Sequence, residues 1–188
     1  MQLCLFVALV LPFVLAQPDP TTVCLPNQLQ SDLYDFDKTD FGTVAADFTK
    51  NMTSLRFVKT NIRVVYDLLA GKGYLVSGTG ECTSFDLQAS QVITQCLPAS
   101  ATPLTTNDTV IGFGATSLKL VSYDVQFDDK TKVRAAFTDS TPAFPVLRQV
   151  IGTSTNITGD VLFFTNSKTT VDNDLFIVPT VCTPLTAV

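Results

Sequence analysis

The alternation of apolar and polar residues is the feature that most limits how this chain can fold. Single polar residues separate Val121, Tyr123 and Val125, and a period of two recurs in short segments from about residue 54 onward. This period places apolar side chains on one face of an extended strand, whereas an amphipathic helix repeats every 3.6 residues. Gly, Asn, Asp or Pro separates the segments, as expected for turns. The sequence therefore predicts an all-β fold.

The predicted strands cover most of the chain after residue 54. They are residues 62–68, 74–77, 81–87, 121–128, 133–138, 146–151, 161–165 and 175–178. The fourth and fifth are close enough in sequence to form an antiparallel hairpin. Only residues 41–48 and 85–94 are candidates for short helices, and neither has a long amphipathic stripe. No crossover helix separates the strands, so we expect an antiparallel meander in a single domain.

The first 16 residues predict a secretory signal peptide. They contain no charged side chain, and an apolar stretch leads to Val14-Leu15-Ala16, with small residues where a signal peptidase reads. Cleavage after Ala16 would leave residues 17–188 as the mature domain. An N-terminal anchor is the alternative, but the stretch is short for a bilayer, and no later segment is long enough to span one. We expect a secreted, extracellular protein without a transmembrane segment.

Cysteine usage agrees with secretion. Cys4 leaves with the signal peptide, and four cysteines remain, namely Cys24, Cys82, Cys96 and Cys182. An even number in a secreted chain predicts two disulfides, with three possible connectivities. A zinc site with four cysteine ligands is the alternative, but such sites use closely spaced pairs that this chain lacks.

Three Asn-x-Thr sequons predict N-linked glycans. They begin at Asn51, Asn107 and Asn156. Asn107 lies in a run of Thr, Pro and Asp residues that is typical of a loop. Each sequon therefore predicts a surface position in a glycoprotein.

The composition excludes several classes of function. The chain has no His, which rules out a Ser-His-Asp triad, a Cys-His pair and a His-ligated zinc ion. It has 12 basic and 17 acidic side chains, so we expect no nucleic-acid surface. A pair of carboxylates, as in glycosidases, is the remaining catalytic alternative, but no Asp or Glu pair stands out. We expect no enzymatic activity and name no catalytic residue.

Three groups of acidic residues are candidate calcium sites. They are Asp32, Asp35, Asp37 and Asp40; Asp124, Asp128 and Asp129; and Asp172 with Asp174. An EF-hand loop starting at Asp35 requires Gly at its sixth position and Glu at its twelfth, where this chain has Asp40 and Ala46. A solvated acidic loop, the polar side of a sheet and a turn explain the three groups without a metal. The metal ligands are therefore unassigned, and calcium stays an open alternative.

Phenylalanine is the dominant aromatic residue. The chain has 14 Phe, 4 Tyr and no Trp, and only Phe6 and Phe13 lie in the signal peptide. Ordinary packing of a β core accounts for many of them. The functional alternative is an apolar cavity inside a curved sheet, which would hold a lipid or another hydrophobic molecule.

In the C-terminal part of the chain, a strand with the paired aromatics Phe163-Phe164 leads to an acidic residue, Asp172 or Asp174, then to Phe176 and Pro179, and ends at Cys182. This order of residues resembles the end of the ependymin family. Three earlier segments are also similar to that family: Arg63-Val64-Val65-Tyr66, Lys72-Gly73-Tyr74 ahead of Glu81-Cys82-Thr83, and Pro103 to Thr109. Together these features cover most of the mature chain in the family's order.

Three positions depart from the family pattern. No aromatic residue follows Cys24-Leu25-Pro26, no Cys precedes Pro145-Val146, and Cys96 is additional. The family's disulfides therefore cannot be carried over whole. We expect the pairs Cys82–Cys182 and Cys24–Cys96.

The resemblance implies a secreted glycoprotein in which two antiparallel sheets form a half-open sandwich or half-barrel around a hydrophobic pocket. It also implies a homodimer, a lipid-like ligand, possible calcium binding, and a link to the extracellular matrix and cell adhesion. The alternative, from another class, is a structural component of the matrix or of a secretion that acts through glycans and self-association.

Overall fold

The computed structural model describes residues 19–88, 92–104, 109–126, 131–152 and 161–185. The predicted signal peptide at 1–16, the sequons at Asn107 and Asn156, and the acidic pair Asp128 and Asp129 lie outside these residues.

The described residues form short strands and single-turn helices, in agreement with the predicted class. The strands are β1 (Gln28–Asp35), β2 (Asp40–Asp47), β3 (Met52–Phe57), β4 (Ile62–Asp67), β5 (Lys72–Ser77), β6 (Cys82–Asp86), β7 (Thr102–Pro103), β8 (Thr109–Ile111), β9 (Leu118–Gln126), β10 (Thr131–Thr138), β11 (Pro145–Gly152), β12 (Val161–Lys168) and β13 (Thr183–Pro184). The 3-10 helices are η1 (Pro20–Thr22), η3 (Gly114–Thr116) and η4 (Asn173–Phe176). The all-β fold is confirmed.

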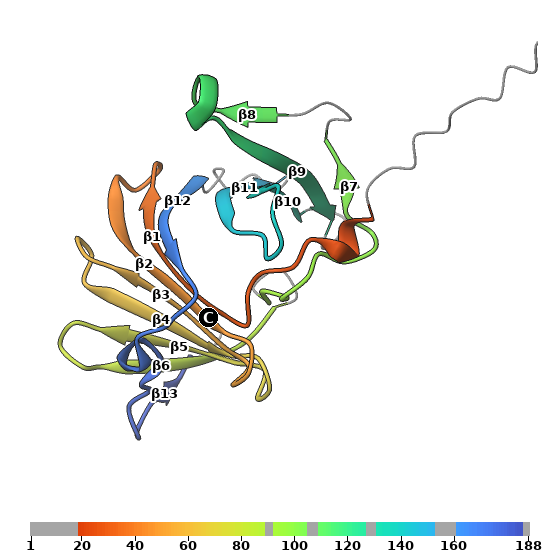
Figure 1. The fold of residues 1–188 in the computed structure, drawn as a ribbon. Helices are drawn as coiled ribbons and strands as arrows, with labels where there is room; N and C mark the ends of the chain where they lie inside the picture. The colour runs from red at the N-terminus through yellow and green to blue at the C-terminus, as the bar shows by residue number, and fades with distance from the viewer. Residues whose placement is uncertain (1–18, 89–91, 105–108, 127–130, 153–160, 186–188) are drawn as a thin grey trace, which may run out of the picture.

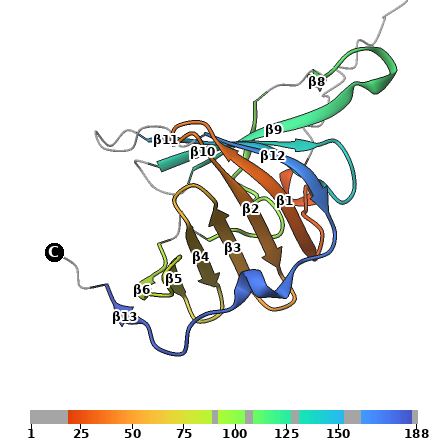
Figure 2. The ribbon, with the colours of Figure 1, turned by 90° about the vertical axis from the view of Figure 1, so that its left-hand side faces the viewer.

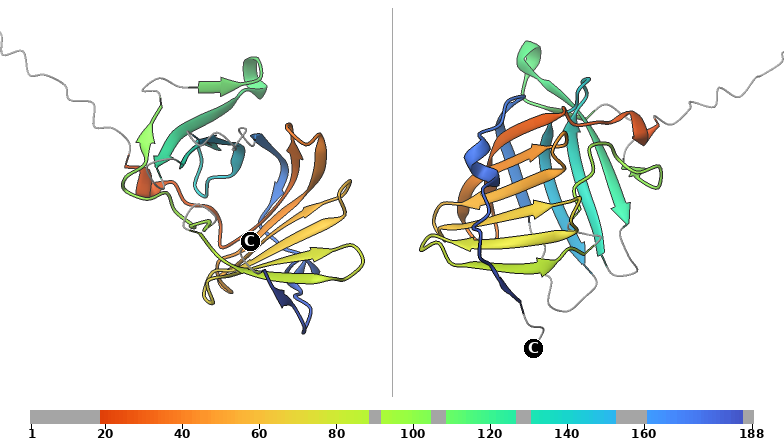
Figure 3. Two further views of the ribbon diagram at one scale, coloured as in Figure 1. Left: turned by 180° about the vertical axis from the view of Figure 1, so that it is seen from behind. Right: turned by 90° about the horizontal axis from the view of Figure 1, so that it is seen from below.

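All of these strands belong to one open sheet. Its order is β13-β6-β5-β4-β3-β2-β1-β12-β11-β10-β9-β7, with β8 also paired to β9. The pairs are antiparallel except for β13 and β6, which are parallel. Strands β2–β6 and β9–β11 lie on opposite sides of the β1–β12 pair (Figure 1), and from below the two groups cross one another (Figure 3). The two sheets suggested by the family resemblance are thus hydrogen-bonded into one.

One part of the apolar core lies on the face of this sheet that we call the inner face. It carries the buried cluster of Leu33, Val44, Leu162 and Phe164, against which Leu55 and Phe57 pack. Because side chains alternate between the faces of a strand, Ala45 lies on the opposite, outer face. Each face carries a separate set of covering segments.

The N-terminal segment covers the inner face of β9 and β10. Val23 packs with Leu97 against Tyr123, and Leu25 packs near Phe137. The Cys24–Cys96 disulfide and a β-bridge between the same two residues join this segment to residues 94–101. We call the two joined segments, 19–27 and 94–101, the N-terminal cover.

The C-terminal segment lies on the outer face. Leu175 and Phe176 of η4 pack against Ala45 and Met52. Figure 2 shows the segment passing β2, β3 and β4 on its way to β13, where the Cys82–Cys182 disulfide ties it to β6. We call residues 169–182 the C-terminal strap.

Three predictions of local structure were wrong. The candidate helix at 85–94 does not form in the described part of that range, where Phe85 and Asp86 end β6. Residues 41–48 were a candidate for a short helix, but they belong to β2, whose last residues from Val44 to Asp47 are all buried and so show no period of two. Residues 175–178 were expected to form a strand. Instead Asp172 accepts a hydrogen bond from the backbone N–H of Asp174 and starts the 3-10 turn of η4.

Candidate functional site

The inner face of β3–β6 presents a group of apolar side chains that are only partly buried. They are Leu55 and Phe57 on β3, Val64 and Tyr66 on β4, Leu75 on β5 and Phe85 on β6. In register, Val64 lies between Leu55 and Leu75, so these three form a row across the strands. We call the six residues the apolar platform. Period two within residues 55–57 and 64–66 is the sequence signal that could have identified it.

The platform is separate from the core under the N-terminal cover. Among the described residues, the cluster around Leu33, against which the platform residues Leu55 and Phe57 pack, has no member in common with either the Tyr123 cluster or the Phe137 cluster. Leu75 keeps 40% of its surface exposed, although it lies in the middle of β5. Binding of an apolar molecule to a partly exposed apolar face of this kind is favourable, because it removes apolar surface from water.

Two aromatic rings form one end of the platform. Tyr66 and Phe85 meet edge to face, with ring centroids 6.4 Å apart. Gly73 lies between them in register, and a Cβ built on Gly73 would be 2.3 Å from the Phe85 ring. The ring therefore lies directly over the glycine, which explains why the sequence has no side chain at this position.

Two hydroxyl groups that point from inner-face positions are buried without a hydrogen-bond partner among the described residues. They are Oγ1 of Thr53 and the hydroxyl of Tyr123. Burial, with the negative charges of Asp139 and Asp19, raises the pKa of Tyr123. The phenol therefore stays neutral and serves as part of the core under the cover.

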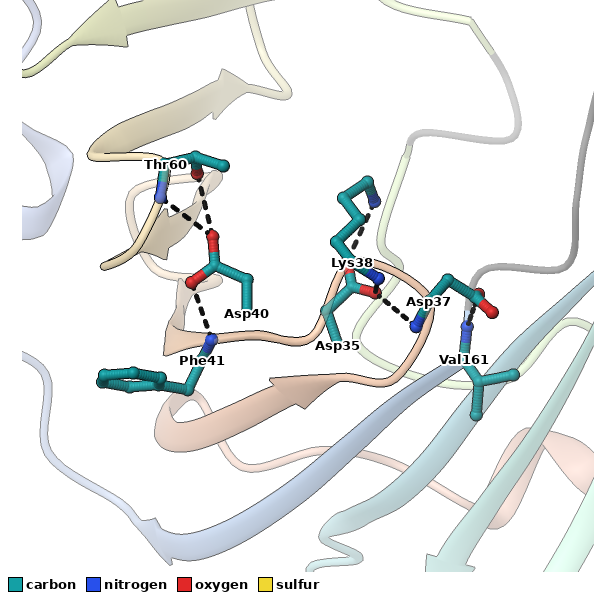
Figure 4. A network of polar contacts seen from close by, with 7 residues as sticks. All are labelled: Asp35, Asp37, Lys38, Asp40, Phe41, Thr60 and Val161. Atoms are coloured by element: carbon teal, nitrogen blue, oxygen red, sulfur yellow. Dashed lines mark hydrogen bonds and ion pairs between the residues drawn. The ribbon is translucent and has the colours of Figure 1, made fainter.

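The acidic residues near the β1–β2 hairpin do not form the expected solvated loop. Asp35 and Asp40 are buried, with 0% and 1% of their surface exposed. Asp35 Oδ1 accepts hydrogen bonds from the backbone N–H groups of Asp37 and Lys38, and Oδ2 lies 2.9 Å from Lys38 Nζ (Figure 4). Asp37 Oδ2 accepts from the backbone of Val161. The prediction of a solvated loop is wrong for Asp35 and Asp40, whose carboxylates accept hydrogen bonds from backbone N–H groups of the turns, whereas Asp32 and Asp37 are exposed.

Asp40 ties one hairpin to the next. Its Oδ1 accepts from the N–H groups of Phe41 and Lys59, and its Oδ2 accepts from the N–H and hydroxyl of Thr60. Burial opposes ionisation of Asp40, but these hydrogen bonds outweigh it and lower its pKa. The carboxylate is therefore fully engaged by its own protein.

Two of the other acidic candidates, Asp124 and Asp172, are also engaged. Asp124 forms ion pairs with Arg134, at 3.0 Å, and with Lys132. Asp172 caps η4. Within the described ranges, no group of three or more acidic or Cys side chains is arranged to hold a metal ion.

The predicted covalent sites that fall in the described part are well placed. Both expected disulfides form, Cys24–Cys96 and Cys82–Cys182. Asn51 is exposed in the turn between β2 and β3, with a positive φ of 55°. A glycan at Asn51 would project from the surface without displacing core residues.

The comparisons with known proteins show the fold alone. No protein-family model and no curated protein sequence matches the chain. A crystal structure of an uncharacterized conserved protein from Thermus thermophilus is similar, with a TM-score of 0.53 and 10% sequence identity. The match covers 86% of this chain and 91% of that one. The ependymin resemblance stays a prediction.

No helix among the described residues is both long and apolar enough to cross a lipid bilayer.

Proposed function

We propose that this protein is a non-enzymatic, secreted binding protein that holds a hydrophobic, lipid-like molecule on the apolar platform. The observation that carries the proposal is the placement of six partly exposed apolar side chains on one face of four adjacent strands. Two disulfides suit an oxidising, extracellular compartment. Secretion through the predicted signal peptide, glycosylation and a homodimer belong to this proposal.

Burial of apolar surface would drive binding. Each Å² of apolar area removed from water contributes roughly 25 cal/mol before the costs of association are subtracted. The platform offers aliphatic side chains in its centre and the Tyr66–Phe85 pair at one end. This arrangement favours an acyl chain or a flat hydrocarbon over a polar ligand.

Calcium is not part of the proposal. The carboxylates of Asp35, Asp40 and Asp124 already accept hydrogen bonds or ion pairs from neighbouring residues. A cation would have to displace these donors, at a cost in folding free energy.

The test uses Leu75→Asp and the matched control Leu69→Asp. Leu75 lies in the platform, whereas Leu69 is 83% exposed in the turn between β4 and β5, so both variants should fold. Covering the exposed 40% of Leu75 is worth about 1 kcal/mol, so its replacement should weaken binding about fivefold or more. The probe is a fluorescent fatty acid titrated into the secreted protein, with native mass spectrometry and organic extraction to detect a co-purified molecule.

Binding that is weaker in Leu75→Asp and unchanged in Leu69→Asp is the expected result. Equal binding by both variants would show that the fatty acid does not use the platform. A protein that releases no apolar molecule and binds no fatty acid would instead favour the alternative, a structural role in the matrix or a secretion.

A further inference from the structure

A small recess at one end of strands β3, β4 and β5 differs from the platform in chemistry. It measures about 260 Å³ and lies where the β3–β4 and β5–β6 hairpins turn, beside the C-terminal strap. Its lining residues are Arg56, Asn61, Ile62, Arg63, Val76, Ser77 and Gly78. Pockets for drug-sized ligands span roughly 300–1,000 Å³, so this recess suits a smaller group.

Two arginines face each other in the recess. Arg56 and Arg63 are directly opposite in the β3–β4 register, on the outer face. Like charges in this position destabilise a sheet unless something compensates them. In the described part of the chain no carboxylate comes within 4.0 Å of either guanidinium, although the charge of Asp174 acts favourably on Arg63 from farther away. The pair is thus under-compensated in a chain whose net charge is −5.

The strap already uses part of Arg63. Its two terminal nitrogens donate to the carbonyl oxygens of Asp174 and Ile177, at 2.7 and 2.6 Å, and its Nε is buried without a partner among the described residues. Carbonyl groups satisfy the donors but do not neutralise the charge. Burial, together with the positive charge of Arg56, lowers the pKa of Arg63. A bound anion would offset both the cost of burying the charge of Arg63 and its repulsion from Arg56.

Arg56 and Asn61 supply the available donors. Arg56 is exposed, and no hydrogen bond or ion pair engages its side chain within the described ranges. The side-chain amide of Asn61 lies over Gly78, where an added Cβ would come within 1.7 Å of Asn61 Nδ2. A glycine at 78 therefore makes room for this amide at the edge of the recess. A guanidinium presents a planar pair of N–H donors that matches the oxygens of a carboxylate or sulfate.

We propose that this recess binds an oxyanion, a sulfate or carboxylate group, through Arg56 and Asn61, with the charge of Arg63 behind them. The source of the group is a free anion or an acidic glycan, and the chemistry of recognition is the same. The site shares no residue with the apolar platform, and its two arginines lie on the opposite face of the same strands.

The experiment is isothermal titration calorimetry of the secreted protein with sodium sulfate and, separately, with a heparin-derived tetrasaccharide. The variants are Arg56→Gln and Asn61→Asp, since Asp also tolerates the positive φ of 51° at residue 61. The control is Lys59→Gln, which removes the same charge outside the recess. Arg63 is left intact because it holds the strap.

The expected result is saturable binding of at least one probe, weakened about tenfold or more by Arg56→Gln and by Asn61→Asp, and retained by Lys59→Gln. Binding of sulfate alone identifies a free anion as the source, and a preference for the tetrasaccharide identifies a glycan. Binding of neither probe, or equal binding by wild type and Arg56→Gln, overturns the proposal.

Discussion

The Cys24–Cys96 disulfide should control both the stability of the fold and the closure of the N-terminal cover. Its two cysteines are 72 residues apart. In the chain-entropy description, closing a loop of that length stabilises the folded state by about 4.4 kcal/mol, through the conformations that the unfolded chain loses. Replacing both cysteines with serine should lower the free energy of unfolding by about 3–4 kcal/mol, since measured values often fall short of this description.

The same replacement has a local effect that a general loss of stability does not. Without the disulfide, Val23 and Leu97 are no longer held against Tyr123. We expect more binding of a hydrophobic dye under native conditions, in addition to a lower midpoint of urea unfolding. The control is Cys82→Ser with Cys182→Ser, which opens a loop of similar length, 100 residues, on the outer face.

The two variants should lose similar free energies of unfolding, but only the first should bind more dye, because the hydrogen bonds of Arg63 to Asp174 and Ile177 still hold Leu175 and Phe176 on the outer face in the second. Equal dye binding by both would contradict the role assigned to the cover. A loss below about 1 kcal/mol in the first variant would refute the entropic reasoning itself.

Two further predictions concern buried polar groups. Tyr123→Phe removes a buried hydroxyl that has no partner among the described residues, so the melting temperature should rise by about 2–4 °C. Tyr74 is half-buried, and the control Tyr74→Phe should change the melting temperature little. A lower melting temperature for Tyr123→Phe would show that the hydroxyl is hydrogen-bonded. Burial opposes ionisation of Asp47, but hydrogen bonds from Thr49 and Gln28 outweigh it and lower the pKa of Asp47. The Asp47 carboxylate therefore stabilises the fold at pH values above its pKa in the unfolded chain, about 3.9, and this contribution is lost as the pH falls through the lower pKa of the folded state. The urea midpoint of Asp47→Asn should therefore fall less than that of wild type between pH 5 and pH 2; parallel curves would show that the carboxylate contributes nothing.

The sequence predicted the strands whose apolar residues recur with a period of two. Residues 121–126 alternate cleanly and residues 133–137 do so except at Ala136; they lie in β9 and β10 respectively. The β1–β2 hairpin was missed for two reasons. Buried positions of β1 carry the polar residues Ser31 and Asp35, and β2 is buried on both faces near its end, where the alternation disappears. Periodicity therefore fails where polar side chains are buried or where apolar side chains occupy both faces of a strand.

Both candidate sites depend on register, which a sequence does not show. Arg56 and Arg63 are seven residues apart and become neighbours only through the turn between β3 and β4. In the same way, the burial of Asp40 depends on the N–H groups of Lys59 and Thr60, which belong to the next hairpin. Residue types alone suggested a solvated acidic loop, because the donors that hold the carboxylate lie far along the chain.

The pairing of β1 with β12 has a consequence for how the protein is made. Within β1–β6 and within β9–β12, each strand pairs with its neighbour in sequence, but β1 pairs with β12, where Gln30 meets Lys168. During synthesis the free edge of β1 therefore has no partner until nearly the whole chain has left the ribosome. An unpaired edge strand invites pairing with other chains. Closing so long a loop should also be the slow step of folding. Aggregation of nascent chains should therefore compete mainly with the pairing of β1 and β12.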